Sequence, residues 1–272
     1  MNSESPTGPD CPICSGNRRE LFQARVLRKY DVRYLLCESC GLIQTEQPYW
    51  LKEAYSSAIA DTDTGLVSRN LEIAAKLSGL LYFCIRADAP YLEAAGGYGL
   101  LTRVMRDRGF DFRWHDPYCE NIFARGFEWD PKGATKRCAA VTAFEVLEHV
   151  SNPIEFIRNA LAQANTKTII FSTLLYEGEP PRPEQWWYYS LESGQHISFF
   201  RLGTLKVLAE KLGLRLYSHG SFHVLTSETI NETAFTICTS RLSGAIDIYV
   251  RHRLKSRALN DHTQISGRQS QQ

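Results

Sequence analysis

Short apolar segments and longer amphipathic segments alternate along most of this chain. Near the N-terminus, two short apolar-rich segments predict two strands, at residues 21–27 and 32–37. Farther along, short segments of five or six residues predict further strands, at residues 90–94, 112–116, 139–144 and 168–173. Longer segments with apolar residues at helical spacing predict helices, at residues 66–84, 100–108, 153–164, 202–212 and 241–254.

The order of these elements predicts the fold class. From residue 89 onward a strand is repeatedly followed by a helix, which favours an α/β protein with a doubly wound sheet. Gly213 directly follows one predicted helix and is expected to cap its C-terminus. Residues 41–65 are turn-rich, and residues 256–272 are polar and expected to be disordered.

Composition excludes several classes of protein. The chain has 272 residues, of which 43% are hydrophobic and 22% are charged, and its net charge is +1. A near-neutral chain has no overall attraction to nucleic acid or anionic membranes, so neither is favoured as a partner. No apolar run approaches the ~20 residues of a membrane span, and the first residues lack the features of a secretory signal.

Four of the eight cysteines form two Cys-x-x-Cys motifs, separated by 22 residues. Two such turns bring four thiolates together, as structural zinc sites require. The predicted ligands are Cys11, Cys14, Cys37 and Cys40. Gly16 and Gly41 follow the motifs where a turn needs a positive φ. The alternative is a pair of redox-active or free dithiols; a catalytic zinc would need an open position. Thiolate ligands fit a reducing cytoplasm, which is the expected location.

A glycine-rich turn follows the predicted strand at residues 90–94. The segment reads Leu92-Glu-Ala-Ala-Gly-Gly-Tyr-Gly99, and it matches neither a phosphate-binding P-loop nor the Gly-x-Gly-x-x-Gly dinucleotide motif. Gly97 and Gly99 allow the backbone to approach a ligand closely. Asp116 ends the next strand, where a carboxylate usually binds the hydroxyls of a ribose. Together these features indicate a nucleotide-type cofactor.

Three segments resemble motifs of class I S-adenosylmethionine-dependent methyltransferases. Residues 92–99 resemble the first motif, usually Asp/Glu-x-Gly-x-Gly-x-Gly, and Phe144-Glu-Val-Leu-Glu-His-Val150 resembles the block after the fourth strand. Gln195-His-Ile-Ser-Phe-Phe200 resembles a block of one subgroup. The resemblance covers roughly residues 66–240 and implies a Rossmann-like methyltransferase sheet with S-adenosylmethionine as cofactor.

The resemblance also implies roles for individual residues. Glu93, Gly97 and Gly99 would line the methionine moiety, and Asp116 would bind the ribose. Phe144 and Glu145 would border the cofactor beyond the strand at residues 139–144. The chain departs from the motif at Ala95, where the family has its first glycine. The cofactor-contacting positions implied in this way are Glu93, Ala95, Gly97, Gly99, Asp116, Phe144 and Glu145.

The cysteine motifs together with this core look like the sugar C-methyltransferases that act on nucleotide-linked deoxyketosugars. Those enzymes usually carry a further C-terminal domain, whereas about thirty residues follow Cys238 here. The implied acceptor is a small molecule of the sugar, nucleotide-sugar or glycan type. Two alternatives remain open: an RNA methyltransferase with a zinc clip, and a degenerate binding module in which Ala95 and Gln195 mark lost activity.

His196 is the candidate general base, because the pKa of histidine is near neutral and the loop lies between a strand and a helix. The alternative is a structural histidine that holds this loop. His149 is better suited to a buried, orienting role. The proline-rich segment at residues 176–200 is the expected substrate lid, and its aromatic run, Trp186–Tyr189, would either stack on a sugar or base or cover an apolar patch.

The sequence therefore divides into four parts. They are a zinc-ribbon-like domain at residues 1–48, a linker and helical segment at 49–88, a methyltransferase domain at 89–240 with its lid at 176–200, and a C-terminal helix with a disordered tail at 241–272.

Overall fold

The computed structural model describes residues 10–55, 63–131 and 137–269. The chain falls into two compact units, each built from three stretches of sequence. Unit 1 comprises residues 1–60, 144–159 and 171–227, and unit 2 comprises residues 61–143, 160–170 and 228–272. Residues 1–9, where a secretory signal would lie, and residues 56–62 of the predicted linker are outside the described residues.

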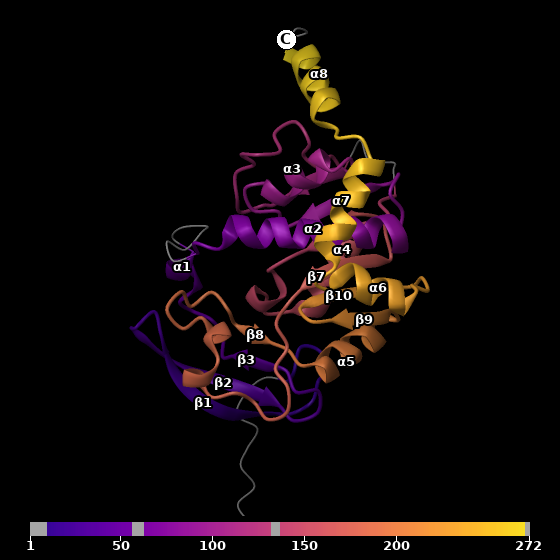
Figure 1. The fold of residues 1–272 in the computed structure, drawn as a ribbon. Coiled ribbons are helices and arrows are strands. Elements are labelled where there is room, and N and C mark those ends of the chain that lie inside the picture. Colours follow the sequence, from indigo (N-terminus) through magenta and orange to yellow (C-terminus); the bar gives the residue numbers. More distant parts are fainter. Residues whose placement is uncertain (1–9, 56–62, 132–136, 270–272) are drawn as a thin grey trace, which may run out of the picture. The chain divides into compact units, whose positions relative to one another are not determined.

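Unit 2 is built on parallel strands. Strand β4 (Pro90–Ala94) lies between β5 (Asp111–His115) and β6 (Ala140–Ala143) and pairs in parallel with both. Parallel neighbours need a crossover connection, and α3 (Leu100–Asp107) provides it between β4 and β5. The long helix α2 (Leu66–Cys84) packs against α3, α6 (Glu232–Thr239) and α7 (Ser243–Arg253) of the same unit (Figure 1).

Unit 1 contains an antiparallel sheet and a hairpin. The antiparallel sheet has the order β1-β2-β3-β8 and consists of β1 (Arg18–Val26), β2 (Tyr30–Cys37), β3 (Ile43–Thr45) and β8 (Ser198–Phe199). In the hairpin, β9 (Arg215–His219) pairs antiparallel with β10 (Phe222–Thr226), and α5 (Leu202–Leu212) packs on β9. Unit 1 also contains α1 (Leu51–Ala54) and the 3₁₀ turns Leu147–His149, Pro183–Gln185 and Trp187–Tyr189. The helix α4 (Pro153–Gln163) is divided between the units after Asn159, and α8 (Ala258–Gln269) belongs to unit 2.

Strand β7 (Thr168–Ser172) belongs partly to each unit, since the division falls after Ile170. It is one of six hydrogen-bonded strands, which follow the order β5-β4-β6-β7-β10-β9. The strand order reverses at β4, because β5 lies on one side of it and the later strands β6 and β7 lie on the other. The helix α3 connects β4 to β5, and α4 connects β6 to β7. This arrangement is that of a doubly wound sheet. The predicted α/β fold class is confirmed.

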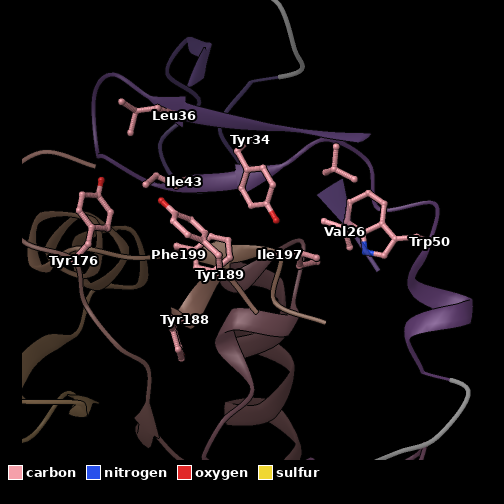
Figure 2. Packing of buried hydrophobic residues seen from close by; sticks show 11 residues of the cluster. Val26, Tyr34, Leu36, Ile43, Trp50, Tyr176, Tyr188, Tyr189, Ile197 and Phe199 are labelled. Carbon is pink, nitrogen blue, oxygen red and sulfur yellow. The ribbon is translucent and has the colours of Figure 1, made fainter. Parts of the chain in front are cut away.

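Aromatic side chains form the core of unit 1 (Figure 2). The ring of Tyr189 lies 5.5 Å from that of Tyr34 and 4.8 Å from that of Phe199, both nearly edge-on. Tyr188 and Tyr189 are 2% and 1% exposed, whereas Trp187 is 76% exposed. The two tyrosines of the aromatic run therefore cover the apolar face of the antiparallel sheet, and Trp187 alone remains open to a ligand among these three side chains.

The end of the chain differs from the prediction. Residues 256–272, expected to be disordered, include the helix α8. Its Asp261 is 3% exposed and accepts two hydrogen bonds from the Arg106 guanidinium, at 2.6 and 2.8 Å. In the same way Asp247 of α7 accepts hydrogen bonds from buried Arg108, at 2.8 and 3.0 Å. Polar composition misled the prediction for residues 256–272, because α8 is held by the buried ion pair of Asp261 with Arg106.

Within the described ranges, no helix combines the length and the apolar character needed to cross a bilayer.

We predict that Asp261→Ala lowers the free energy of unfolding by about 3 kcal/mol, because it removes the main carboxylate partner of a buried guanidinium. Asp107→Ala is the matched control: this residue also pairs with a neighbouring arginine, but its side chain is half exposed, so a change within about 0.5 kcal/mol is expected. Urea denaturation of both variants measures the difference. Equal stability of the two variants would contradict the docking role of Asp261.

Candidate functional site

The glycine-rich turn after β4 is built from residues in the left-handed region. Ala95, Gly97 and Gly99 have φ angles of +55°, +53° and +83°, and Gly99 is the N-cap of α3. A Cβ atom placed on Gly97 would meet no atom within 4 Å, whereas one on Gly99 would lie 2.7 Å from the Asn121 side chain. The turn therefore offers open space beside the backbone at Gly97 and close packing at Gly99.

Asp116, which follows β5, is hydrogen-bonded to this turn. Its Oδ2 accepts the backbone N–H of Gly97 at 2.9 Å, and its Oδ1 accepts the N–H groups of Tyr118 and Cys119 at 2.8 and 3.1 Å. The Trp114 indole N–H donates to the carbonyl oxygen of Gly97 at 2.9 Å. A carboxylate can accept about four hydrogen bonds, so Asp116 retains capacity for a ligand hydroxyl.

Glu93 lies beneath the turn. It is 6% exposed, and its carboxylate accepts the hydroxyl of Thr102 on α3. Burial raises the pKa of this carboxyl group to about 7; the hydrogen bond from Thr102 opposes the shift, and the charge of Asp116 adds to it. Glu93 thus braces β4 against α3 and changes its charge near neutral pH.

Unit 2 brings five of the seven predicted cofactor positions together: Glu93, Ala95, Gly97, Gly99 and Asp116. The arrangement combines open backbone at Gly97 with a carboxylate able to bind hydroxyls, at the carboxyl ends of two adjacent parallel strands. This donor and acceptor set fits the nucleoside part of S-adenosylmethionine.

The two remaining cofactor positions lie in unit 1. The ring of Phe144 packs 5.1 Å from that of Phe222. Glu145 has a φ of +56°, and its carboxylate accepts the Ser172 hydroxyl at 2.6 Å while its N–H donates to the same oxygen at 2.9 Å. A non-glycine residue in this conformation indicates a constrained turn after β6.

Two histidines of unit 1 face each other. Their rings lie 4.8 Å apart at 87°. The Nδ1 of His149 lies 3.0 Å from the carbonyl oxygen of Gln195 and 2.9 Å from the hydroxyl of Tyr55, and the Nδ1 of His196 lies 2.7 Å from the carbonyl oxygen of Tyr188. A carbonyl oxygen only accepts, so each Nδ1 carries a proton and donates it to the backbone.

Burial lowers the pKa of His149 to about 3, and the neighbouring His196 adds to this effect. His149 is therefore neutral at physiological pH. Glu148, fully buried, lies within the same cluster of potential ligand atoms. Sequence reasoning missed Glu148 and Tyr55. The adjacent Glu and His in the block at residues 144–150 could have indicated Glu148. Nothing in the sequence marks Tyr55.

The four predicted zinc ligands form one cluster. The Sγ atoms of Cys11 and Cys40 lie 3.6 Å apart, those of Cys14 and Cys37 lie 3.4 Å apart, and all four fall within 4.8 Å of one another. Backbone N–H groups point at two of the sulfurs, from Gly16 to Cys14 at 3.4 Å and from Cys40 to Cys37 at 3.5 Å.

One detail of the cysteine turns differs from the prediction. Gly41 has the expected positive φ, +78°, but in the first turn Ser15 adopts it, with φ +60°, rather than Gly16. Gly16 is required for a different reason. A Cβ atom there would lie 2.5 Å from the Ser39 hydroxyl.

We predict that Ala95→Gly raises the free energy of unfolding by roughly 1 kcal/mol, because a left-handed φ strains alanine and not glycine. The matched control is Ala94→Gly, one residue earlier in the extended strand β4, which should lower it by roughly 0.5–1 kcal/mol. Chemical denaturation should show changes of opposite sign in the free energy of unfolding of the two variants. A loss of stability at both positions would exclude strain at Ala95.

The sequence model of a protein family described as Methyltransferase domain matches residues 68–219, which is more than half of the chain. No curated protein matches the chain at a significant level.

Among solved structures, TnmH is similar with 17% sequence identity and a TM-score of 0.46, over 67% of this chain and 62% of TnmH. The chain thus spans less than two thirds of TnmH. Magnesium protoporphyrin IX methyltransferase from Synechocystis PCC 6803, with bound S-adenosylhomocysteine, is similar with 12% identity and a TM-score of 0.39, over 64% of this chain and 90% of that one. An O-methyltransferase family protein from Burkholderia thailandensis shows 13% identity and a TM-score of 0.42, over 66% and 68% of the two chains. The chain therefore belongs to the family described as Methyltransferase domain.

Proposed function

We propose that this methyltransferase acts on a small-molecule acceptor of the sugar, nucleotide-sugar or glycan type, with His196 as the general base. The observation that carries the proposal is the anchoring of His196. Its Nδ1–H donates to the Tyr188 carbonyl oxygen at 2.7 Å, and the ring stays partly exposed. This bond holds the ring through Nδ1, so that Nε2 is the atom at which proton transfer would take place.

S-adenosylmethionine supplies a methyl group on a positively charged sulfur, which makes that methyl group electrophilic. As the acceptor atom bonded to the methyl carbon, the carbon–sulfur bond would break and S-adenosylhomocysteine would leave. His196 Nε2 would accept the proton that the acceptor atom loses. The imidazolium that results is stabilised through Nδ1–H by the Tyr188 carbonyl. The Tyr188 ring, 4.7 Å from the His196 ring, limits its rotation. His149, neutral and buried, positions its neighbour rather than accepting the proton.

The cofactor would be held by the residues of the turn after β4. In this proposal Asp116 binds the ribose hydroxyls, and the backbone at Gly97 lies against the methionine moiety, with Glu93 beneath it. Support comes from the open space at Gly97 and the remaining acceptor capacity of Asp116.

A sugar-type acceptor is supported by Trp187. Its indole is 76% exposed and lies 5.6 Å from the ring of Tyr188, whose carbonyl anchors the base. An exposed aromatic face offers a stacking surface for the apolar face of a sugar ring. The net charge of +1 provides no comparable support for an RNA acceptor.

We further propose that Cys11, Cys14, Cys37 and Cys40 hold a structural zinc ion. Zinc–thiolate bonds of about 2.3 Å place tetrahedral sulfurs about 3.8 Å apart. The sulfur pairs at 3.4 and 3.6 Å are close to this spacing. The ion would fix the end of β2 against α5, since the Thr204 hydroxyl at the start of α5 donates to the Cys40 carbonyl at 2.8 Å.

We predict that His196→Asn lowers kcat about 10²–10⁴-fold, because the base is lost, while the Kd for S-adenosylhomocysteine is unchanged. His252→Asn, an exposed histidine on α7, is the matched control and should retain full turnover. Methyl transfer to a panel of nucleotide sugars and free glycans measures both variants. Full turnover by His196→Asn would exclude the general-base role.

Metal analysis of reduced, metal-replete protein tests the zinc proposal. About one zinc per chain is expected, and Cys37→Ser should lose it and unfold unit 1. Cys119→Ser, a thiol outside the cluster, should keep the full zinc content. Less than half a zinc per wild-type chain would contradict a structural site.

A further inference from the structure

The helix α7, which packs on α2, buries polar side chains and exposes apolar ones (Figure 1). Ser243 and Asp247 are buried, and Asp247 accepts the hydroxyl of Ser78 on α2 at 2.7 Å. On the solvent side of α7, Ile248 and Tyr249 are 70% and 49% exposed. A surface helix ordinarily has the reverse distribution, with its apolar side toward the core. The exposed apolar residues therefore indicate a surface that contacts a partner.

Two aromatic rings at the end of α2 extend this surface. The Phe83 side chain is 52% exposed. Its ring lies 6.1 Å from that of Tyr249 and 4.9 Å from that of Tyr82, and the Tyr82 ring lies 6.3 Å from that of Tyr249. Side chains of the two helices thus form one apolar patch, which consists of Tyr82, Phe83, Ile248 and Tyr249.

Exposed cations border the apolar patch. Arg253 lies four residues after Tyr249, a spacing that puts two side chains on the same face of a helix. The Arg253 guanidinium also interacts with Tyr82. Arg251 and Lys255 are exposed on either side of it in the sequence. In the ranges that the structure describes, no carboxylate pairs with these three cations, which we call the basic border.

The segment that carries these cations is locally positive. Residues 241–257 contain five arginines and lysines and a single carboxylate, that of Asp247. This carboxylate is buried and paired with Arg108, at 2.8 and 3.0 Å. Near the end of α2, Asp88 is balanced by Arg86 at 3.6 Å. The overall net charge of +1 conceals this local excess, and an anionic partner is complementary to the surface.

The arrangement favours an anionic lipid bilayer over other anionic partners and over a second copy of the chain. A twofold interface is self-complementary, so a second copy docked through this surface would bring like charges together. Single-stranded nucleic acid stacks on free aromatic faces, whereas the Phe83 and Tyr249 rings lie nearly parallel, at 19°, and are engaged with each other. A folded partner would need a groove for the ridge of α7. A bilayer needs none, and helices with an apolar side flanked by Arg and Lys lie in its interface.

We propose that α7 and the C-terminal end of α2 form a peripheral binding surface for anionic lipid bilayers. The apolar patch enters the boundary between headgroups and acyl chains, and the basic border contacts the lipid phosphates. The buried side of α7 stays on α2, so binding requires no rearrangement of unit 2. The proposal depends neither on the acceptor nor on the general base.

Cosedimentation of the full-length protein with lipid vesicles tests the proposal. The probes are vesicles of phosphatidylcholine alone and of phosphatidylcholine with about 30% phosphatidylglycerol. We expect at least about tenfold stronger binding to the anionic vesicles, because each cation near an anionic surface adds to the attraction. Salt at about 0.5 M should remove most of this difference by screening. These comparisons use the wild type and need no variant.

Variants then locate the surface. Ile248→Ser should weaken binding to the anionic vesicles about tenfold, because an apolar side chain no longer enters the interface. Arg251→Gln combined with Arg253→Gln should weaken it at least about tenfold. The matched controls are Val67→Ser, an exposed apolar residue at the other end of α2, and Lys206→Gln, an exposed cation on α5. Both controls should bind as the wild type does, and thermal unfolding identifies any variant that fails to fold.

Three results would overturn the proposal. The first is no binding to anionic vesicles, or equal binding to neutral and anionic ones. The second is binding that neither the Ile248→Ser variant nor the double arginine variant weakens. The third is a different occupant: binding of polyuridylic acid without vesicle binding would assign the surface to RNA, and self-association that Ile248→Ser abolishes would assign it to a second copy.

Discussion

The hydrogen bond between the Gly97 N–H and the Asp116 carboxylate is the constraint on which the cofactor turn depends. It joins the segments that follow two adjacent parallel strands, and the indole of Trp114 holds the same peptide from the carbonyl side. The turn that carries this peptide contains three left-handed residues at alternate positions, 95, 97 and 99. Glycine adopts the left-handed conformation at two of these positions without strain, whereas Ala95 adopts it with strain. The chain thus tolerates backbone strain at Ala95 in a turn that places the open backbone of Gly97 beside the Asp116 carboxylate.

A comparable dependence links packing and chemistry in unit 1. Tyr188 is almost fully buried in the aromatic core, and its carbonyl oxygen anchors His196. The position of the proposed base is therefore set by the packing of a rigid core rather than by a loop.

The fold was accessible from the sequence because its elements have clear hydrophobic periods. The strands around β4, the helix α3 and the two cysteine motifs lie close to their predicted positions. The helix α8 was not accessible, because what buries it is the pairing of Asp261 with Arg106, residues 155 positions apart. The aromatic run left two interpretations open, and only tertiary packing separates the buried Tyr188 and Tyr189 from the exposed Trp187. Tyr55 joined the histidine pair without any sequence signal, since a single tyrosine in a turn-rich segment has no pattern.

In the proposed cofactor site, Asp116 binds the ribose of the cofactor while it fixes the turn. Titration calorimetry with S-adenosylhomocysteine and with an analogue that lacks the ribose hydroxyls tests it most directly, in the wild type and in Asp116→Ala. In the wild type, loss of the hydroxyls should weaken binding about 10–100-fold, as expected for hydrogen bonds to a charged group. In Asp116→Ala the two ligands should bind equally weakly. An equal penalty for the analogue in both proteins would contradict the account, because the hydroxyls would then be bound elsewhere.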